Sequence, residues 1–256
     1  MTRSGGHAAG RFPALAAVAL LVSGCGALES GGSSGGEDTT VTVLAAASLT
    51  SPFTTIAEQY MATHPGTDLR LSFGSSTTLA QQVVQGAPAD LLATAGTSPL
   101  DLLGDIEPTE TVTIARNTLE IATPPDNPAA VEGLADLAGP DVDVVLCAST
   151  VPCGRAADEV LSRAAVEPHV VSREIDVTAT LAKVRLGEAD AAVVYHSDVA
   201  SAKGAVDGVE IPEADNAVLT YPLARLGDTA AAADFAAYVS GPEGTRVLTD
   251  AGFLAP

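Results

Sequence analysis

The stretch Val41–Thr50, VTVLAAASLT, is typical of a buried strand that ends in three alanines and leads directly into a helix. Its small residues place one hydroxyl, that of Ser48, at the turn between the strand and the helix. The helix signal follows at once: Ser51 is a good N-cap, Pro52 suits the first helical position, and apolar residues then recur at helical spacing. The stretch therefore predicts a strand-to-helix turn with a polar group at a helix N-terminus.

Three later loops also precede helices, and the first of them repeats this design. They are residues 69–79 (LRLSFGSSTTL), residues 147–154 (CASTVPCG) and residues 174–178 (EIDVT), and Tyr195 ends a further strand. Free backbone N–H groups and the positive end of the helix dipole make helix N-termini suitable for anions. Taken singly, such a Ser is most often only a cap, and such a Tyr is most often part of the core. Because ligands bind at the carboxyl ends of parallel strands, we expect these four loops to converge on one cleft.

Strand patterns alternate with helical patterns from residue 41 onward, which favours an α/β fold of mostly parallel sheets covered by helices. Strands are expected at 41–46, 68–73, 89–94, 111–116, 119–123, 142–147, 169–173, 189–195, 208–211 and 217–226. Helices are expected at 51–63, 77–85, 98–104, 131–138, 154–166, 178–187, 228–240 and 242–250. The β-rich runs at 111–125 and 217–226 suggest that the chain crosses twice between two lobes, 41–118 with 222–256, and 119–221.

The composition argues against a nucleic-acid partner. The chain has a formal net charge of −20 and no Trp. Beyond residue 25 it carries 10 basic and 32 acidic residues, a net charge of −22. Binding to a phosphate backbone depends on clustered Lys and Arg, which this chain lacks. A small anion remains compatible with this acidity because exposed charges are largely screened beyond about 10 Å at ordinary salt.

The first 25 residues have the pattern of an export signal. Arg3 and Arg11 precede an apolar run from Phe12 to Val22, which is too short to span a bilayer as a stable helix. The run ends in LVSGC (21–25), which resembles the lipobox of bacterial lipoproteins and would make Cys25 the lipidated first residue after cleavage. The alternative is a plain signal peptide with an incidental cysteine. Residues 26–40, rich in Gly and Ser, are expected to be a flexible tether to the outer face of the cell membrane.

Several motifs resemble one family, the molybdate-binding proteins of bacterial ABC transporters. The motifs are AAASLT (45–50), SSTTLA (75–80), GAPADL (86–91), VPCG (151–154), VVYHSD (193–198) and GPEG (241–244). The resemblance covers about Val41 to Phe253. It implies a two-lobed periplasmic-binding-protein fold of type II, with the ligand in the cleft, closing about hinges at 117–123 and 217–223. It also implies a monomer that delivers its anion to a membrane permease driven by an ATPase, with no cofactor.

The resemblance also implies the residues that bind molybdate or tungstate. Carried over by motif, the donors are the hydroxyl and backbone N–H of Ser48 and of Ser76, the backbone N–H groups of Cys153 and Val177, and the phenol of Tyr195. The family member on which this transfer rests has Ala at the position of Cys153, a change that keeps the backbone donor. No metal other than that of the bound oxyanion is expected.

Donor chemistry alone leaves the ligand open. A fully ionised tetrahedral oxyanion offers only acceptors, so neutral N–H and O–H donors suit it, whereas a protonated phosphate would want one acceptor. Asp176 is expected to cap the helix that follows it and not to enter the pocket. Sulfate also offers only acceptors, so sulfate, an iron chelate or an organic acid remain alternative ligands for a binding protein.

Cys147 and Cys153 flank a proline-containing loop, and in an exported protein this spacing favours a disulfide. Closing so small a loop stabilises the fold by roughly 2 kcal/mol in chain-entropy terms. Two buried thiols are the alternative. A secreted hydrolase with a Ser48 nucleophile is a further alternative, but the histidines show no metal spacing and the chain has no Gly-x-Ser-x-Gly elbow. We therefore expect no enzyme.

Overall fold

The structure is a computed structural model, and it describes residues 39–256. The predicted export signal and the lipidation of Cys25 lie outside the described residues. Strand β1 begins at Thr39, so the last two residues of the range expected to be tether already belong to the folded part. Within residues 39–256, no helix combines the length and the apolar character needed to cross a membrane.

In the described part of the chain, nine strands form a sheet in the order β2-β1-β3-β9-β4-β7-β5-β6, with β8 paired to β4. The parallel groups are β1 with β2 and β3, and β5 with β6 and β7, whereas β4 and β9 run antiparallel to their neighbours. The bounds are β1 (Thr39–Ala46), β2 (Thr67–Gly74), β3 (Leu91–Ala93), β4 (Glu110–Thr123), β5 (Val144–Cys147), β6 (Val170–Glu174), β7 (Ala191–Tyr195), β8 (Asp207–Glu210) and β9 (Val218–Arg225).

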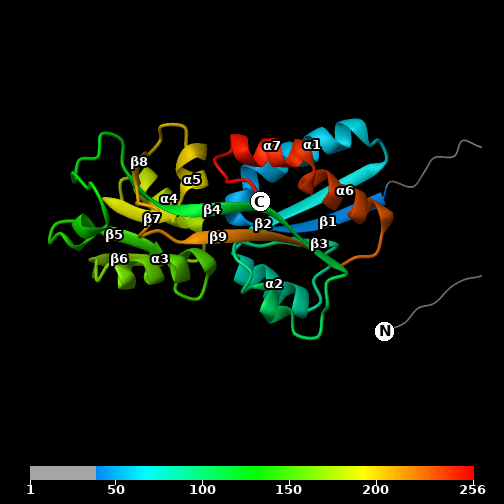
Figure 1. The fold of residues 1–256 in the computed structure, drawn as a ribbon, viewed down its shortest axis with the longest axis horizontal. Helices are drawn as coiled ribbons and strands as arrows, with labels where there is room; N and C mark the ends of the chain where they lie inside the picture. Colours follow the sequence, from blue (N-terminus) through cyan, green and yellow to red (C-terminus); the bar gives the residue numbers. More distant parts are fainter. Residues whose placement is uncertain (1–38) are drawn as a thin grey trace, which may run out of the picture. The chain divides into compact units, whose positions relative to one another are not determined.

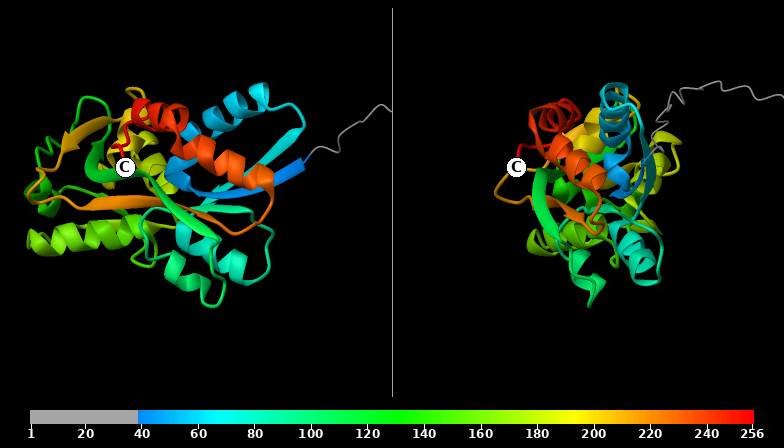
Figure 2. Two further views of the ribbon diagram at one scale, coloured as in Figure 1. Left: turned by 45° about the vertical axis from the view of Figure 1, so that its right-hand side comes forward. Right: turned by 90° about the vertical axis from the view of Figure 1, so that its right-hand side faces the viewer.

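Helices cover both faces of each parallel group. Helices α1, α6 and α7 lie on one side of β1–β3 and α2 on the other, while α3 lies across β5 and β7 from α4 and α5 (Figures 1 and 2). The helices are α1 (Thr50–Thr63), α2 (Ser76–Val84), α3 (Pro152–Arg163), α4 (Val177–Arg185), α5 (His196–Ser201), α6 (Ala230–Ser240) and α7 (Pro242–Asp250), with 3-10 turns η1 (Ala47–Leu49), η2 (Leu100–Leu103) and η3 (Leu134–Ala138). The predicted α/β architecture is confirmed.

Some local predictions are wrong. The strands expected at 111–116 and 119–123 are one strand, β4, because it pairs with β9 along most of its length and continues against β7 and β8. The helices expected at 98–104 and 131–138 are only the short turns η2 and η3. Ser51 does not cap α1, because η1 leads straight into the helix and Leu49 occupies the N-cap position. Helix α5 was not expected, since six residues are too few to show a periodic pattern.

Burial explains why the opening stretch forms a central strand. From Val43 to Ala46 every residue of β1 is buried, so the strand shows a continuous apolar run and not an alternation. Its neighbours are covered in turn by α1, whose Phe53, Ile56 and Tyr60 point into the same core. The packed core around β1 therefore fixes the end of this strand, and with it the position of the turn that contains Ser48.

The start of α3 lies unusually close to the end of β5. A Cβ atom on Gly154 would collide with the backbone of Cys147 and Ala148, the carbonyl oxygen of Ala148 above all. The disulfide between Cys147 and Cys153 joins the same two segments, with Cα atoms 5.8 Å apart. Glycine at this position therefore lets the N-terminus of α3 approach the strand end.

We expect Gly154→Ala to lower the free energy of unfolding by about 1–3 kcal/mol, because the added methyl group forces the backbone of α3 away from β5. Gly133→Ala is the matched control, since Gly133 has an extended backbone with no atom within 4 Å of the added Cβ. The control should change stability by no more than about 0.5 kcal/mol. Urea unfolding of both variants makes the comparison, and equal stabilities would contradict the close approach.

Candidate functional site

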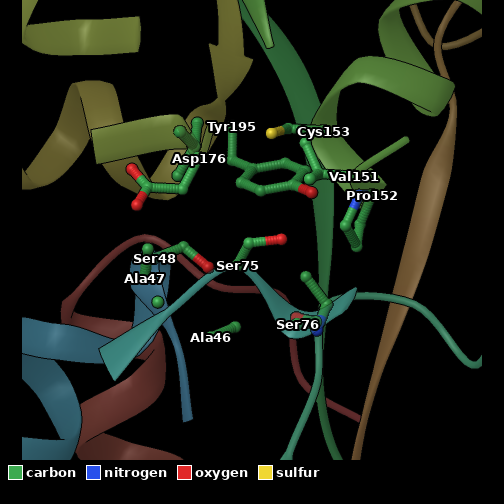
Figure 3. A pocket seen from close by; sticks show the side chains of 13 residues that line it. Ala46, Ala47, Ser48, Ser75, Ser76, Val151, Pro152, Cys153, Asp176 and Tyr195 are labelled. Carbon is green, nitrogen blue, oxygen red and sulfur yellow. Dashed lines mark hydrogen bonds between the residues drawn. The ribbon is translucent and has the colours of Figure 1, made fainter. Parts of the chain in front are cut away.

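A small cavity lies where the strand-to-helix turns meet. The space in it that is open to the centre of a water-sized sphere is about 20 Å³, so it is compact. The lining residues lie at the ends of strands of both parallel groups and in the turns that follow these strands (Figure 3). They are Ala46, Ala47, Ser48, Gly74, Ser75, Ser76, Ala95, Val151, Pro152, Cys153, Asp176, Val177 and Tyr195. All five residues predicted to bind the ligand line this one cavity.

Three helices direct their N-termini at the cavity. Helix α2 begins at Ser76, α4 begins at Val177, and α3 begins at Pro152. Because Pro152 has no N–H, Cys153 supplies the first backbone donor of α3. The first N–H groups of a helix have no partner within the helix, and the helix dipole places partial positive charge there. Backbone N–H groups, and not charged side chains, therefore supply these hydrogen-bond donors to the cavity.

Two of the serine hydroxyls are held by neighbours. The Oγ of Ser76 accepts a hydrogen bond from the backbone N–H of Ala95 at 3.0 Å. Since this bond uses an acceptor lone pair, the Ser76 proton remains available for the cavity. The Oγ of Ser48 lies 3.1 Å from the hydroxyl of Tyr221, and either group can be the donor.

The phenol of Tyr195 is the remaining predicted donor. Tyr195 is 1% exposed, and among residues 39–256 its hydroxyl has no hydrogen-bond partner. Figure 3 shows its ring lying over the cavity, opposite Ser48 and Ser76. Burial raises the pKa of this phenol well above its ordinary value of 10.0, so the group keeps its proton at neutral pH. Tyr195 can therefore donate but does not become an anion that would repel a ligand.

The sequence does not predict the buried polar chain that lies behind Ser48. Tyr221 on β9 and Asn117 on β4 are both fully buried, and Asn117 donates through Nδ2 to Ser197 Oγ at 2.8 Å. A longer contact of 3.5 Å joins Asn117 Nδ2 to the Tyr221 hydroxyl. The only signal in the sequence was an Asn and a Tyr within apolar strand patterns, which also fits ordinary core residues.

The lining carries one acidic side chain and no basic one. Asp176 caps α4 as expected, with Oδ1 accepting from the N–H of Ala179 at 2.9 Å, although it also lines the cavity. Figure 3 shows its carboxylate turned away from Ser75 and Tyr195. The arrangement offers a small ligand mainly neutral donors, which favours a group that only accepts hydrogen bonds.

The cysteines and histidines near these segments have other partners. Cys147 and Cys153 form the expected disulfide, so the thiol of Cys153 is not available as a nucleophile. His169 lies 3.0 Å from Asp143, and His196 lies 2.7 Å from Glu120. None of the histidines in the described residues lines the cavity. Residues 39–256 also hold no group of three or more His, Cys, Asp or Glu placed to bind a metal ion.

Comparison with known proteins identifies the class. Residues 41–254 match the family model of bacterial extracellular solute-binding proteins, and the chain belongs to this family. Solute-binding proteins of this family are not enzymes and carry no resident cofactor.

Three similar proteins have names that refer to the binding of a substrate. The molybdate-binding protein ModA of Mycobacterium tuberculosis strain H37Rv is 38% identical over 224 residues, covering 84% of this chain and 85% of the relative. A Bacillus subtilis relative with "ABC transporter substrate-binding lipoprotein" in its name is 29% identical, covering 95% and 97%. The solved periplasmic molybdate-binding protein of Azotobacter vinelandii has a TM-score of 0.72 at 21% identity, covering 84% and 99%. This last likeness confirms the predicted fold class.

One buried acid beside the site makes stability depend on pH. Asp198 accepts a hydrogen bond from the backbone N–H of Tyr195 at 3.0 Å. Burial raises the pKa of its carboxyl from 3.8 to about 7. The folded chain thus retains a proton that the unfolded chain releases near pH 4, so stability falls as pH rises from about 4 through 7 and is level above that.

We expect Asp198→Asn to remove this fall, because Asn keeps an acceptor for Tyr195 but does not ionise. Between pH 5 and 7 the unfolding free energy of the wild type should drop relative to that of the variant by about 2 kcal/mol. Urea unfolding at pH 5, 6, 7 and 8 measures the difference. Asp101→Asn, at an exposed position of η2, is the control and should keep the wild-type dependence. Parallel curves for wild type and Asp198→Asn would show that Asp198 titrates normally.

Proposed function

We propose that this chain is the solute-binding subunit of an ABC importer and that it captures molybdate or tungstate. The observation that carries this proposal is the cavity of about 20 Å³, lined by helix N-termini and neutral hydroxyls from four turns. Pockets for organic ligands typically measure about 300–1,000 Å³. The cavity size therefore favours a compact inorganic anion over an iron chelate or an organic acid.

The proposed donors are those of Ser48, Ser76, Cys153, Val177 and Tyr195. Ser48 and Ser76 would each give a hydroxyl and a backbone N–H, Cys153 and Val177 a backbone N–H, and Tyr195 its phenol. A dianion with four equivalent oxygens can accept from all of them, and each bond to a charged group is stronger than a neutral one. The name of the M. tuberculosis relative supports molybdate as the solute.

Closure of two lobes would complete this donor set. The proposed lobes are 41–118 with 222–256, and 119–221, and the proposed hinges are 117–123 and 217–223. Two contacts between the lobes support the idea: Thr77 donates through Oγ1 to the carbonyl of Thr150 at 3.1 Å, and Arg155 donates through Nη2 to Ser98 Oγ at 3.0 Å. None of the four residues in these contacts lines the cavity.

The protein is also proposed to be exported, anchored to the membrane and bound by transporter subunits. The lipobox-like LVSGC sequence would leave the mature protein attached through Cys25 to the outer face of the membrane, as a monomer. The B. subtilis relative with "lipoprotein" in its name supports this anchor. The loaded protein would then deliver its anion to a membrane permease that an ATPase subunit drives.

The central test is thermal unfolding of residues 38–256 with molybdate, tungstate, sulfate or phosphate. At 100 times its dissociation constant a ligand stabilises the native state by about 2.7 kcal/mol, which raises the melting temperature by several degrees. We expect this shift with molybdate and tungstate only.

Tyr195→Phe should weaken molybdate binding about 10-fold or more without lowering the stability of the free protein, because it removes one donor to a charged ligand. Small-angle scattering during the same titration should show a more compact particle if the lobes close.

Tyr238→Phe is the matched control for Tyr195→Phe. Tyr238 packs edge-on against Tyr60 at 5.2 Å between ring centroids and does not line the cavity. Its loss of a hydroxyl should leave molybdate binding unchanged. A shift with sulfate alone would keep the site and overturn the ligand, whereas no shift with any of the four anions would overturn the proposed function.

Anchoring is tested in the full-length chain, expressed in a bacterium that processes lipoproteins. The wild type should incorporate labelled fatty acid and sediment with membranes, and Cys25→Ser should do neither, since the thiol is the acylated group. Cys147→Ser leaves Cys25 in place and is the control, which should still sediment. Equal release of wild type and Cys25→Ser into the soluble fraction would favour a plain signal peptide.

A further inference from the structure

Ser75 has a buried hydroxyl that the donor set above does not use. The residue is 7% exposed and lines the cavity. Within the described part of the chain, its Oγ has no hydrogen-bond partner. Figure 3 shows this oxygen pointing into the cavity below the ring of Tyr195.

The ordinary role of a serine at this position is not fulfilled. Ser75 occupies the N-cap position of α2, where a serine side chain usually accepts from an N–H of the first turn. Here the side chain makes no capping hydrogen bond. Helix stability therefore does not explain why the hydroxyl is turned inward, away from the helix donors it would normally satisfy.

Burying a hydroxyl without a hydrogen-bond partner is unfavourable. A bound ligand that accepts a hydrogen bond would remove this cost. The neighbouring serines differ in this respect, because Ser48 lies against Tyr221 and Ser76 accepts from Ala95. Of the buried polar side-chain atoms without a partner in residues 39–256, two face this cavity, the Ser75 Oγ and the Tyr195 hydroxyl. They come from opposite sides of it.

We propose that Ser75 is a further ligand-binding residue whose hydroxyl donates to the bound oxyanion, opposite the phenol of Tyr195. This inference rests on the proposed function and extends its donor set. Ser48 and Ser76 are oriented by the fold, whereas the hydroxyls of Ser75 and Tyr195 can rotate to follow the anion's oxygens. A fully ionised tetrahedral oxyanion satisfies both at once, because each of its oxygens only accepts.

The experiment is calorimetric titration of residues 38–256 with sodium molybdate, together with melting of the ligand-free protein. Ser75→Ala should weaken binding by about 10- to 100-fold, as expected for loss of a hydrogen bond to a charged group. The melting temperature of the ligand-free variant should stay equal or rise, because the substitution removes a buried polar atom and no hydrogen bond. Ser72→Ala changes an exposed serine on the preceding strand, β2, and is the control that should match the wild type in both measurements.

The outcomes separate the two proposals. Molybdate binding by Ser75→Ala within twofold of the wild type would overturn the role of Ser75 while leaving the proposed function standing. A lower melting temperature of ligand-free Ser75→Ala, together with weaker binding, would show a structural role and would also overturn the inference. A wild type that does not bind molybdate would overturn the proposed function itself, and the inference with it.

Discussion

The site depends on the convergence of helix N-termini at one point, and that convergence follows from strand direction. Strands β1 and β5 belong to parallel groups, and each releases the chain at its carboxyl end into a turn that starts a helix. Three successive antiparallel pairings, β3 with β9, β9 with β4 and β4 with β7, make the two groups run in opposite directions. The carboxyl ends of the two groups are thereby directed at each other, and their turns line the same cavity. The backbone itself then supplies the donors, so the lining needs only small side chains such as Ala46 and Ala47. Larger side chains there would fill the space that the ligand requires.

The second constraint is that two long strands run through both halves of the sheet. Strand β4 pairs with β9 and with β7, and β9 also pairs with β3, so these two strands connect the two parallel groups. Their buried polar residues, Asn117 and Tyr221, lie behind Ser48. A change in the twist of these strands would therefore move the hydroxyl that orients Ser48. The segments proposed to act as hinges and the proposed binding site are linked by hydrogen bonds as well as by the chain.

The sequence was sufficient for the architecture and for most of the lining, because both depend on local patterns. A strand-to-helix turn with small and hydroxyl residues is visible in VTVLAAASLT, and the disulfide was visible in the spacing of Cys147 and Cys153. The continuity of β4 was not visible, because pairing with β9 overrides the local interruption at Arg116 and Asn117. The contact of Tyr221 with Ser48 and the unpaired hydroxyl of Ser75 were not visible either. Nothing local distinguishes a capping serine from one whose hydroxyl turns into a cavity.

The net charge of −20 raises the question of how such a chain would select a dianion at all. Long-range attraction is unavailable, so selection must come from short-range terms inside the cavity, where low polarity strengthens each hydrogen bond. Neutral donors discriminate between ligands by protonation state. In a protonated ligand, one oxygen carries an O–H group that needs an acceptor, and a pocket of donors does not provide one. They do not discriminate between anions of equal charge and different size. Discrimination by size therefore depends on the cavity walls, and the Cys147–Cys153 disulfide ties the first turn of α3, which forms part of one wall, to the end of β5.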